Sequence, residues 1–455
     1  MNNSIFKDNN KLKEFMLKYF TYIFFLIINK IKSEIKLPFI RKLNQNKSPK
    51  EIMEDLRFNK ILIKEISVGN PSQIINLQIK LQDYFTFLIS NELNISFSKY
   101  NESISKSIKL IDKEPQLFYS SSFDSGYEIS EIFEYKNIFK LNLNCYLAVS
   151  IDEEVGIESE GILGLKLKNN LVNPYNKNIN FIEQLKKNKI IDNYSFTIKY
   201  PKNKNDFNGE LIIGIKDFDL KNKRDNFLYS KVTEIDGLID WGFKFTKGYF
   251  GKEEIPFHNE LCAQLKIENG IFLSSKGFLE ITEKKFFNYY VNKNKCWKIL
   301  SNDNYTYYFY CDNDIDIKKF DNLIFYMKEL DFNFTFDYND LFYEYENKFY
   351  FLIFFTDVSQ CWEFGYSFFK KYQIIFDQDN KILGFYKDNF NLNEGLSKGL
   401  IIFLSILIIC LIIFIIFCIR QHHVKIKAKE LENIYDENKR KYIPPNENNN
   451  NKLFK

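Results

Sequence analysis

The chain offers few side chains for nucleophilic or metal chemistry. It contains three histidines, and His258 is the only one outside the C-terminal tail. No two cysteines have the C-x-x-C spacing of zinc and redox motifs. Histidine-based zinc sites and Ser/His or Cys/His catalysis therefore have almost nothing to work with, and we expect neither a metal nor a cofactor.

The seven cysteines form two groups. Cys410 and Cys418 lie in a long apolar run, and the other five are Cys145, Cys262, Cys296, Cys311 and Cys361. Because five is an odd number, at most two disulfides form among these and one thiol is left over. A bond between Cys296 and Cys311 would close a short loop, but spacing alone leaves the connectivity open.

Positive charge is concentrated in the C-terminal tail. Residues 420–455 hold nine Lys or Arg and five Asp or Glu, which accounts for the whole net charge of +4. The rest of the chain is balanced, so we expect no nucleic acid partner. At 455 residues, of which 45% are apolar, the chain has room for a large two-lobed body with appendages.

The two ends predict targeting and anchoring. The ten apolar residues Tyr19–Ile28 are too few to span a bilayer and suit a secretory signal, so residues 1–30 are predicted to be a signal or signal-like segment, with a buried helix as the alternative. Residues 399–419 carry no charge over 21 positions, between Lys398 and Arg420. This run has the length of a transmembrane helix, and residues 389–398 form the juxtamembrane linker.

Charge sets the expected topology. Basic residues follow the predicted span more densely than they precede it, which places the tail, 420–455, in the cytosol. The tail is also rich in Asn and charged residues, so we expect it to be disordered. The preceding region would then face the secretory or vacuolar lumen or the cell surface. Five N-x-S/T sequons agree weakly with this topology and are glycosylation candidates: Asn94, Asn101, Asn193, Asn304 and Asn333.

Short runs rich in Ile, Phe, Tyr and Leu alternate with Asn, Asp, Gly and Lys breaks between these ends. This spacing predicts an all-β body with few helices. Two exceptions have helical spacing, "NFIEQLKKNKII" (180–191) and "EKKFFNYYVN" (283–292).

Several motifs then occur in a familiar order. "ISVGNPSQIINLQIKLQDYFTFLIS" contains a G-x-P-x-Q turn at Gly69, and "EGILGL", "GELIIGIKDFD", "NGIFLSSKGFLEITEKKFF" and "CWEFGYSFFKKYQIIFDQDNKILGFY" follow. Their order resembles that of pepsin-like aspartic proteases over residues 59–388. The resemblance implies two β-lobes around a cleft, 59–210 and 211–388, and residues 31–58 are similar to the family's basic propeptides.

That family hydrolyses peptide bonds with two aspartates, one from each lobe, which share a proton. Counting along the matched motifs puts Lys80-Leu81-Gln82 and Leu273-Ser274-Ser275 where the two Asp-Thr-Gly triplets belong. Neither lysine nor leucine can replace a carboxylate of the coupled pair. If the register is off by one, Lys80 is an ordinary solvated strand lysine.

Other positions also depart from the family pattern. Asp83 would need an insertion inside a strand to act as the missing acid, which would turn its neighbours to the opposite face. Phe123 stands at the flap position that is usually tyrosine, and its simplest role is packing. Gln82, Asp83, Ser274 and Ser275 are the candidates for lining the turns of the cleft. The resemblance also makes Cys311 half of a disulfide in the second lobe, with Cys361 as a candidate partner.

Three hypotheses follow for function. The first is a membrane-anchored pseudoprotease that binds a peptide or protein in its cleft, because strand edges bind extended peptides without catalytic residues. The second is an active aspartic endopeptidase whose dyad is misaligned here. The third is a structural surface or adhesion protein that uses the fold as a rigid platform.

Overall fold

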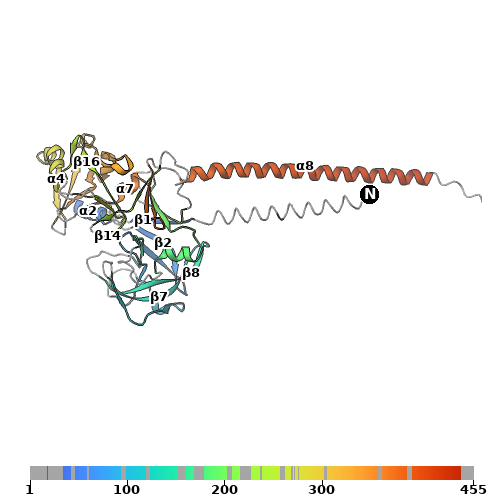
Figure 1. The fold of residues 1–455 in the computed structure, drawn as a ribbon, viewed down its shortest axis with the longest axis horizontal. Helices are drawn as coiled ribbons and strands as arrows, with labels where there is room; N and C mark the ends of the chain where they lie inside the picture. Colours follow the sequence, from blue (N-terminus) through green and yellow to red (C-terminus); the bar gives the residue numbers. More distant parts are fainter. Residues whose placement is uncertain are drawn as a thin grey trace, which may run out of the picture. The chain divides into compact units, whose positions relative to one another are not determined.

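A computed structural model describes the backbone of residues 18, 34–41, 47–58, 61–93, 99–118, 123–151, 159–168, 179–201, 208–215, 227–235, 238–256, 262–267, 270, 272–274, 276–301, 305–356, 361–386 and 392–441. The chain forms two compact units, Met1–Asn389 and Phe390–Lys455. The first unit is mostly β-structure, as the alternating runs predict (Figure 1).

Six antiparallel strands form the middle of the first unit. They come from three distant parts of the sequence, and in order across the sheet they are β12 (Phe227–Lys231), β29 (Ile382–Tyr386), β28 (Ile374–Asp377), β10 (Ser195–Lys199), β11 (Gly209–Ile213) and β1 (Ile35–Arg41). Phe196 on β10 and Phe376 on β28 stack with ring centroids 4.6 Å apart. These strands join the beginning and the end of the unit.

The N-terminal lobe continues this sheet into a barrel. The order runs through β2 (Ile61–Val68), β3 (Gln73–Lys80), β9 (Gly161–Gly164), β4 (Phe87–Ile89), β8 (Phe139–Ile151) and β7 (Phe123–Tyr135), and β7 pairs back onto β2. Two short strands, β5 (Lys109–Leu110) and β6 (Gln116–Leu117), pair with β7. Closing the barrel leaves few unpaired strand edges in this lobe.

The C-terminal lobe contains further sheets. Its nine-stranded sheet contains β15 (Gly242–Lys244), β18 (Cys262–Leu265), β27 (Trp362–Phe364), β19 (Phe272–Ser274), β26 (Ile353–Thr356), β21 (Thr306–Asp312), β25 (Lys348–Phe351), β24 (Phe342–Tyr345) and β20 (Cys296–Leu300). A four-stranded sheet contains β17 (Glu253–Glu254), β16 (Lys247–Phe250), β22 (Leu323–Met327) and β23 (Phe332–Phe336), while β13 (Glu234–Ile235) pairs with β14 (Leu238–Ile239). One apolar core cluster includes residues from both lobes.

Short helices cover the strands. They are α2 (Pro49–Arg57), α3 (Phe181–Lys187), α4 (Lys276–Thr282), α5 (Asn288–Val291), α6 (Tyr338–Leu341) and α7 (Tyr366–Lys371), with the 3₁₀ turns Glu102–Ile104, Ile317–Lys319 and Lys328–Leu330. Both predicted helical segments are confirmed, since α3 lies in 180–191 and a π-helical turn, Glu283–Phe287, leads into α5. The side chain of Asn180 caps α3, which buries Phe181 and Leu185.

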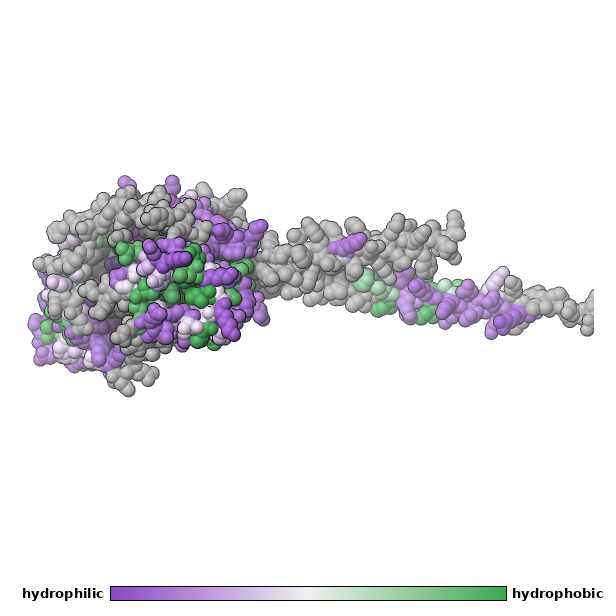
Figure 2. All heavy atoms as spheres, turned by 90° about the horizontal axis from the view of Figure 1, so that it is seen from below, coloured by the Kyte–Doolittle hydropathy of each residue, from purple (hydrophilic) through white to green (hydrophobic). Residues whose placement is uncertain are grey.

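The second unit contains the long helix α8 (Leu392–Lys441). The prediction of a disordered tail is therefore wrong for residues 420–441, which continue this helix. Within the part of the chain that the structure describes, no helix is both long and apolar enough to cross a membrane. Of the predicted span, the side chains of residues 399–413 and 415 lie outside the described residues, as does the predicted signal segment apart from Lys18. The described side chains change from apolar at Phe417 and Ile419 to mainly polar beyond Arg420 (Figure 2).

Candidate functional site

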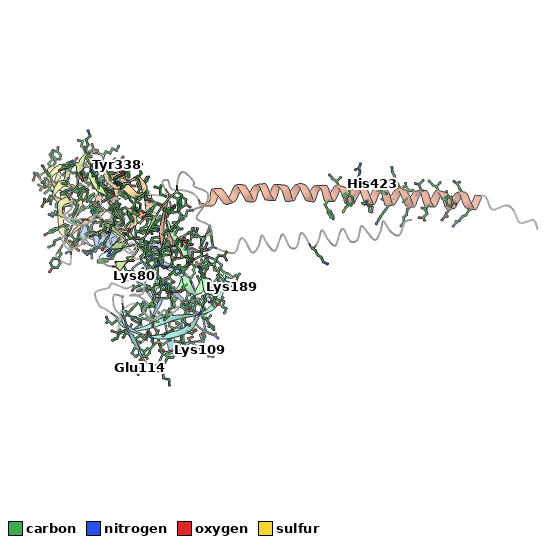
Figure 3. The ribbon with its side chains drawn as sticks, in the orientation of Figure 1. Lys80, Lys109, Glu114, Lys189, Tyr338 and His423 are labelled. Atoms are coloured by element: carbon green, nitrogen blue, oxygen red, sulfur yellow. A yellow bond between two sulfur atoms is a disulfide. The ribbon has the colours of Figure 1, made fainter. Side chains whose placement is uncertain are left out.

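Lys80, the first candidate residue, stands at the end of β3. This strand runs parallel to β9, and Lys80 lies opposite Gly164. The N–H of Leu165 donates a hydrogen bond of 2.8 Å to the carbonyl of Lys80. Lys80 is only 7% exposed, whereas Lys189 lies on the surface (Figure 3). Lys80 is therefore a buried lysine and not an ordinary solvated strand lysine.

Gly164 allows the loop after Lys80 to pack closely. A Cβ at Gly164 would lie 2.3 Å from the carbonyl oxygen of Phe85 and 2.5 Å from that of Asp83. The amide of Lys166 donates to the carbonyl of Asp83 at 2.9 Å. Because only glycine lets two backbones approach so closely, the "EGILGL" motif holds this loop in place.

The same arrangement recurs in the C-terminal lobe. There β18 runs parallel to β27, and the last paired residues are Leu265 and Phe364. The N–H of Lys266 donates to the carbonyl of Phe364 at 3.0 Å. The next residue after Phe364 is Gly365. Lys266 therefore stands opposite a glycine at the end of a parallel strand pair, as Lys80 does.

The strands that pair with β9 and β27 support the correspondence between Lys80 and Lys266. In the first lobe β4 pairs with β9 through Phe87, and in the second β19 pairs with β27 through Leu273. Parallel partners complete both arrangements, β8 for β4 and β26 for β19. Phe87 stands seven positions after Lys80, and Leu273 stands seven positions after Lys266. The register thus corrects the sequence-based assignment: the counterpart of Lys80 is Lys266, and Leu273 corresponds to Phe87.

Sequence reasoning missed Lys266 because strand pairing across a long separation fixes its position. The clue available in the sequence is a repeated pattern, Lys-Leu-Gln-Asp from Lys80 and Lys-Ile-Glu-Asn from Lys266. Ser275 and the side chains of Leu273 and Ser274, which were candidates for the second turn, lie outside the described residues.

Charged side chains lie close to Lys266. Lys266 forms an ion pair and hydrogen bond with Glu363, and both side chains are largely buried, at 18% and 12% exposure. Lys166 approaches Asp240 at 4.0 Å. Burial raises the pKa of Asp240 above 3.8, while Lys166, the hydrogen bond from the Trp241 amide and Lys266 favour its charged form. Cations and carboxylates are thus paired at this end of β18.

Trp241 connects the two lobes at this place. Its indole Nε1 donates to the carbonyl of Leu165 at 2.7 Å, and its own carbonyl accepts from the N–H of Leu265 at 2.8 Å. Leu165 directly follows the glycine opposite Lys80, and Leu265 directly precedes Lys266. One buried tryptophan therefore bonds to the backbone beside both lysines.

The remaining predicted residues of the first lobe have separate environments. Gln82 is exposed, whereas Asp83 is buried. Phe123 begins β7, and its ring centroid lies 4.6 Å from that of Phe87 in a buried apolar cluster. These contacts indicate that Phe123 packs in the core of the first lobe.

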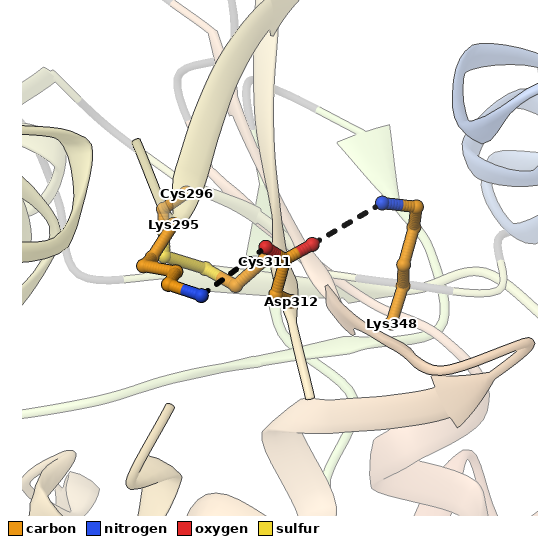
Figure 4. Close-up of a disulfide and its surroundings, with 5 residues drawn as sticks. All are labelled: Lys295, Cys296, Cys311, Asp312 and Lys348. Carbon is orange, nitrogen blue, oxygen red and sulfur yellow. Dashed lines mark hydrogen bonds and ion pairs between the residues drawn. A yellow bond between two sulfur atoms is a disulfide. The ribbon is translucent and has the colours of Figure 1, made fainter. Parts of the chain in front are cut away.

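Two disulfides form among the described cysteines. Cys296 bonds to Cys311 across β20 and β21, beside Asp312, whose carboxylate lies 3.9 Å from Lys295 and 3.4 Å from Lys348 (Figure 4). The second disulfide joins Cys262 to Cys361, so the suggested pairing of Cys311 with Cys361 is wrong. Cys145 is the buried thiol left over. The Cys262–Cys361 bond joins the two strands that lead to Lys266 and Gly365.

Three of the five sequons lie in described segments. Asn333 is exposed on β23, at the edge of its sheet. The side-chain amide of Asn193 donates to the carbonyl of Ile215. The buried hydroxyl of Ser195, in the same sequon, donates to the same carbonyl. The carbonyl oxygen of the Asn101 side chain accepts bonds from the amide and hydroxyl of Ser103. Asn94 and Asn304 lie outside the described residues.

Among the described residues, no group of three or more His, Cys, Asp or Glu side chains is arranged to hold a metal ion. The chain was then compared with known proteins. No curated protein matches it. A family model, the eukaryotic aspartyl protease, matches residues 63–387 and therefore covers both lobes and both lysines. The chain belongs to the eukaryotic aspartyl protease family.

Proposed function

We propose that this chain is a membrane-anchored member of the family that has lost peptide hydrolysis and binds a peptide or protein segment instead. The observation that carries the proposal is the matched pair of strand ends. Where the resemblance implies one aspartate from each lobe, the chain has Lys80 and Lys266.

Aspartic catalysis needs one carboxylate that accepts a proton from water and a second that donates one. A lysine side chain has no carboxyl group, so two lysines cannot supply that pair. Lys266 also has a carboxylate partner of its own in Glu363. Hydrolysis by the family's mechanism is therefore incompatible with this chemistry.

The active-endopeptidase alternative needs two other carboxylates to converge. Among the residues that the structure describes, the acidic side chains to consider are Asp83, Asp240 and Glu363. Asp240 lies near Lys166, and Glu363 is engaged by Lys266, so neither is held as half of a carboxylate pair. Asp83 lies three positions beyond the strand end. This arrangement favours the pseudoprotease over the active enzyme.

Membrane anchoring is part of the proposal and rests on the apolar run 399–419 between Lys398 and Arg420. A continuous helical backbone through this run supports it. The ectodomain would then face the secretory or vacuolar lumen or the cell surface, where disulfides and glycans form. Its two disulfides agree with such a compartment.

The ligand would be an extended peptide or an unfolded segment, since main-chain pairing with a strand edge needs no catalytic group. The remaining alternative, a structural or adhesion protein, predicts no peptide binding at all. Binding of a mixed peptide library to the full-length protein in detergent separates these two roles. Specific enrichment of some peptides supports the peptide-binding pseudoprotease. Enrichment equal to that on empty detergent micelles supports the structural or adhesion protein.

The decisive experiment is a hydrolysis assay on full-length protein with a mixed peptide library, from pH 3 to pH 7. We expect no cleavage above the background of a boiled sample, while an active pepsin-like enzyme run alongside cleaves. Acid-dependent cleavage blocked by a statine-type inhibitor would overturn the proposal. A mock purification from cells that lack the protein is the control for contamination, because cleavage equal to that of the mock sample comes from another enzyme.

A further inference from the structure

Helix α8 continues for 22 residues beyond the predicted membrane span, from Arg420 to Lys441. Eleven of these 22 residues are Lys, Arg, Asp or Glu. The described side chains of this part are all exposed, and in Figure 3 those near His423 project away from the helix. A helix in water gains most of its stability by packing one face against a partner. Within the described residues, no segment of the chain supplies that partner.

One stripe of this helix carries no charge. Its residues follow one another in alternate steps of three and four: Gln421, Val424, Ala428, Leu431, Tyr435 and Asn438. These are the spacings of the a and d positions of a heptad repeat, which face a second helix in a coiled coil. Val424, Leu431 and Tyr435 are 63%, 67% and 70% exposed. Such exposure of apolar side chains marks a surface that a partner covers.

The charged residues lie on the other faces of the helix. All eleven occur among the 16 positions outside the stripe (22 − 6), and none occurs at the six positions of the stripe. A helix that is simply solvated has no reason to keep its charges away from one line. The stripe therefore fits a helix–helix contact better than a solvated face.

The charges beside the stripe favour a second copy in parallel orientation. In a parallel coiled coil, a residue at position g faces the e residue five positions later on the other helix. Lys427 stands at g and Glu432 at e, so two copies form two Lys–Glu pairs by symmetry. Arg420 and Lys425 would face each other with like charges, so we expect the contact to begin at Val424.

The membrane would supply the remaining requirement. The segment 424–438 contains only about two heptads, and helices this short associate weakly in water. Anchoring through residues 399–419 would hold the tails of two copies on the same side of one bilayer and in the same register. Confinement of this kind raises the effective concentration of one helix near the other. A second copy of this chain is therefore the partner that suits the stripe.

We propose that residues 424–438 form a parallel, two-stranded coiled coil with a second copy of this chain, with Val424, Ala428, Leu431 and Tyr435 in the interface. The inference rests on the membrane anchoring in the proposed function and holds whether or not the protein binds or cleaves peptides. A dimer carries two β bodies, so a ligand with two binding segments would be held by avidity.

The first test is disulfide cross-linking of full-length protein in the membranes of the cells that express it. The background is Cys410→Ser/Cys418→Ser, because Cys418 is an exposed thiol. One cysteine is then introduced as Leu431→Cys, at a d position, or as Asn433→Cys, on the opposite face. A disulfide needs Cα atoms within about 7 Å, so we expect Leu431→Cys protein to cross-link at least about tenfold faster on mild oxidation.

Two co-expressed copies with different tags identify the cross-linked product. A product that carries both tags is the expected result. Equal cross-linking rates for the two cysteine positions would overturn the proposal, as would a product in which another protein takes the place of the second copy.

The second test changes the charges beside the stripe in the Leu431→Cys protein. Lys427→Glu places like charges in both symmetric pairs and should slow cross-linking about fivefold, and adding Glu432→Lys should restore the rate. Lys425→Glu is the matched control, because it removes the repulsion with Arg420 and should not slow cross-linking. Equal losses for Lys425→Glu and Lys427→Glu, or no rescue, would contradict the parallel register.

Extraction of the same membranes with alkaline carbonate tests the anchoring separately. If the protein stays in the pellet, it is anchored, and the cross-linking rates decide the coiled coil alone. If the protein is released, the anchoring is contradicted. The coiled coil then stands only if released Leu431→Cys protein still cross-links faster than released Asn433→Cys protein, and equal rates overturn both.

Discussion

Trp241 and Leu165 are joined by a hydrogen bond of 2.7 Å from the indole Nε1 to a backbone carbonyl. The bond is buried and links residues 76 positions apart, one in each lobe. The rings of Phe196 and Phe376, from the central strands, pack on the same indole at centroid distances of 6.0 and 5.1 Å. Trp241 is therefore both a packing residue and a polar connection between the lobes.

Replacing Trp241 by Phe should keep most of the packing and leave the carbonyl of Leu165 without this donor. A buried acceptor that loses its partner costs about 1–3 kcal/mol of unfolding free energy. Denaturant unfolding of the full-length protein measures the loss. Trp362→Phe is the comparison, because Trp362 is buried but its indole nitrogen has no hydrogen-bond partner among the residues that the structure describes. A smaller loss for Trp241 than for Trp362 would contradict this reading.

The ion pair of Lys266 with Glu363 predicts an asymmetric response to mutation. Glu363→Gln removes one partner of a largely buried pair and should cost about 3 kcal/mol of stability. The double variant Lys266→Met/Glu363→Leu removes both charges and should lie within about 1 kcal/mol of wild type. Thermal unfolding of the three proteins checks the pattern, and a double variant less stable than Glu363→Gln would refute it.

Asp240 predicts a pH dependence. Burial raises its pKa in the folded protein above the usual 3.8, so the folded state holds this proton more tightly than the unfolded chain. Stability from this group is then present below pH 3.8 and is lost as the pH rises through the folded-state pKa. The difference in unfolding free energy between wild type and Asp240→Asn should therefore fall with rising pH in this window. A difference in unfolding free energy that rises with pH over the same range would contradict this prediction.

Glu131 on β7 is a buried carboxylate with several donors. It accepts from the hydroxyls of Tyr100 at 2.6 Å and Ser105 at 2.7 Å, from Ser107, and from the amide of Ile132 at 2.8 Å. Glu131→Gln replaces one accepting oxygen by an NH₂ group, which cannot accept these hydrogen bonds. We expect the free energy of unfolding to fall by about 3 kcal/mol. Glu134→Gln on the same strand breaks only a surface ion pair with Lys140 and should cost less than about 1 kcal/mol. Equal losses, measured by denaturant unfolding, would count against the network.

Asn333 is the best exposed of the described sequons. In cells that attach N-linked glycans, we expect Asn333→Gln to remove one glycan from the protein, seen as a shift in mass before and after enzymatic deglycosylation. Asn193→Gln should leave the mass unchanged, because Asn193 and Ser195 bond internally. Absence of any glycan on the protein would argue against the proposed lumenal topology.

Local patterns predicted the parts of the fold that depend on neighbours in sequence. The hairpin around Gly69 and the capped helix at Asn180 are examples, because their residues interact with positions a few steps away. Lys266 depends on β18 pairing with β27, whose cysteines Cys262 and Cys361 are 99 residues apart. The repeat of Lys-Leu-Gln-Asp from Lys80 as Lys-Ile-Glu-Asn from Lys266 is a weak local signal, and its meaning becomes clear only when β18 is paired with β27. The Trp241 bond across the lobes has no local signal.

The order of strands in the central sheet also affects how the protein is made. β1 pairs with β11 about 170 residues later, and β12 pairs with β29, which ends at Tyr386. A ribosome releases β1 long before β11 and completes β29 only near the end of the β body, so the sheet closes late in synthesis. Until then the apolar edges of the early strands are open, and such edges promote aggregation. Mispairing of these early strands is therefore a hazard through most of translation.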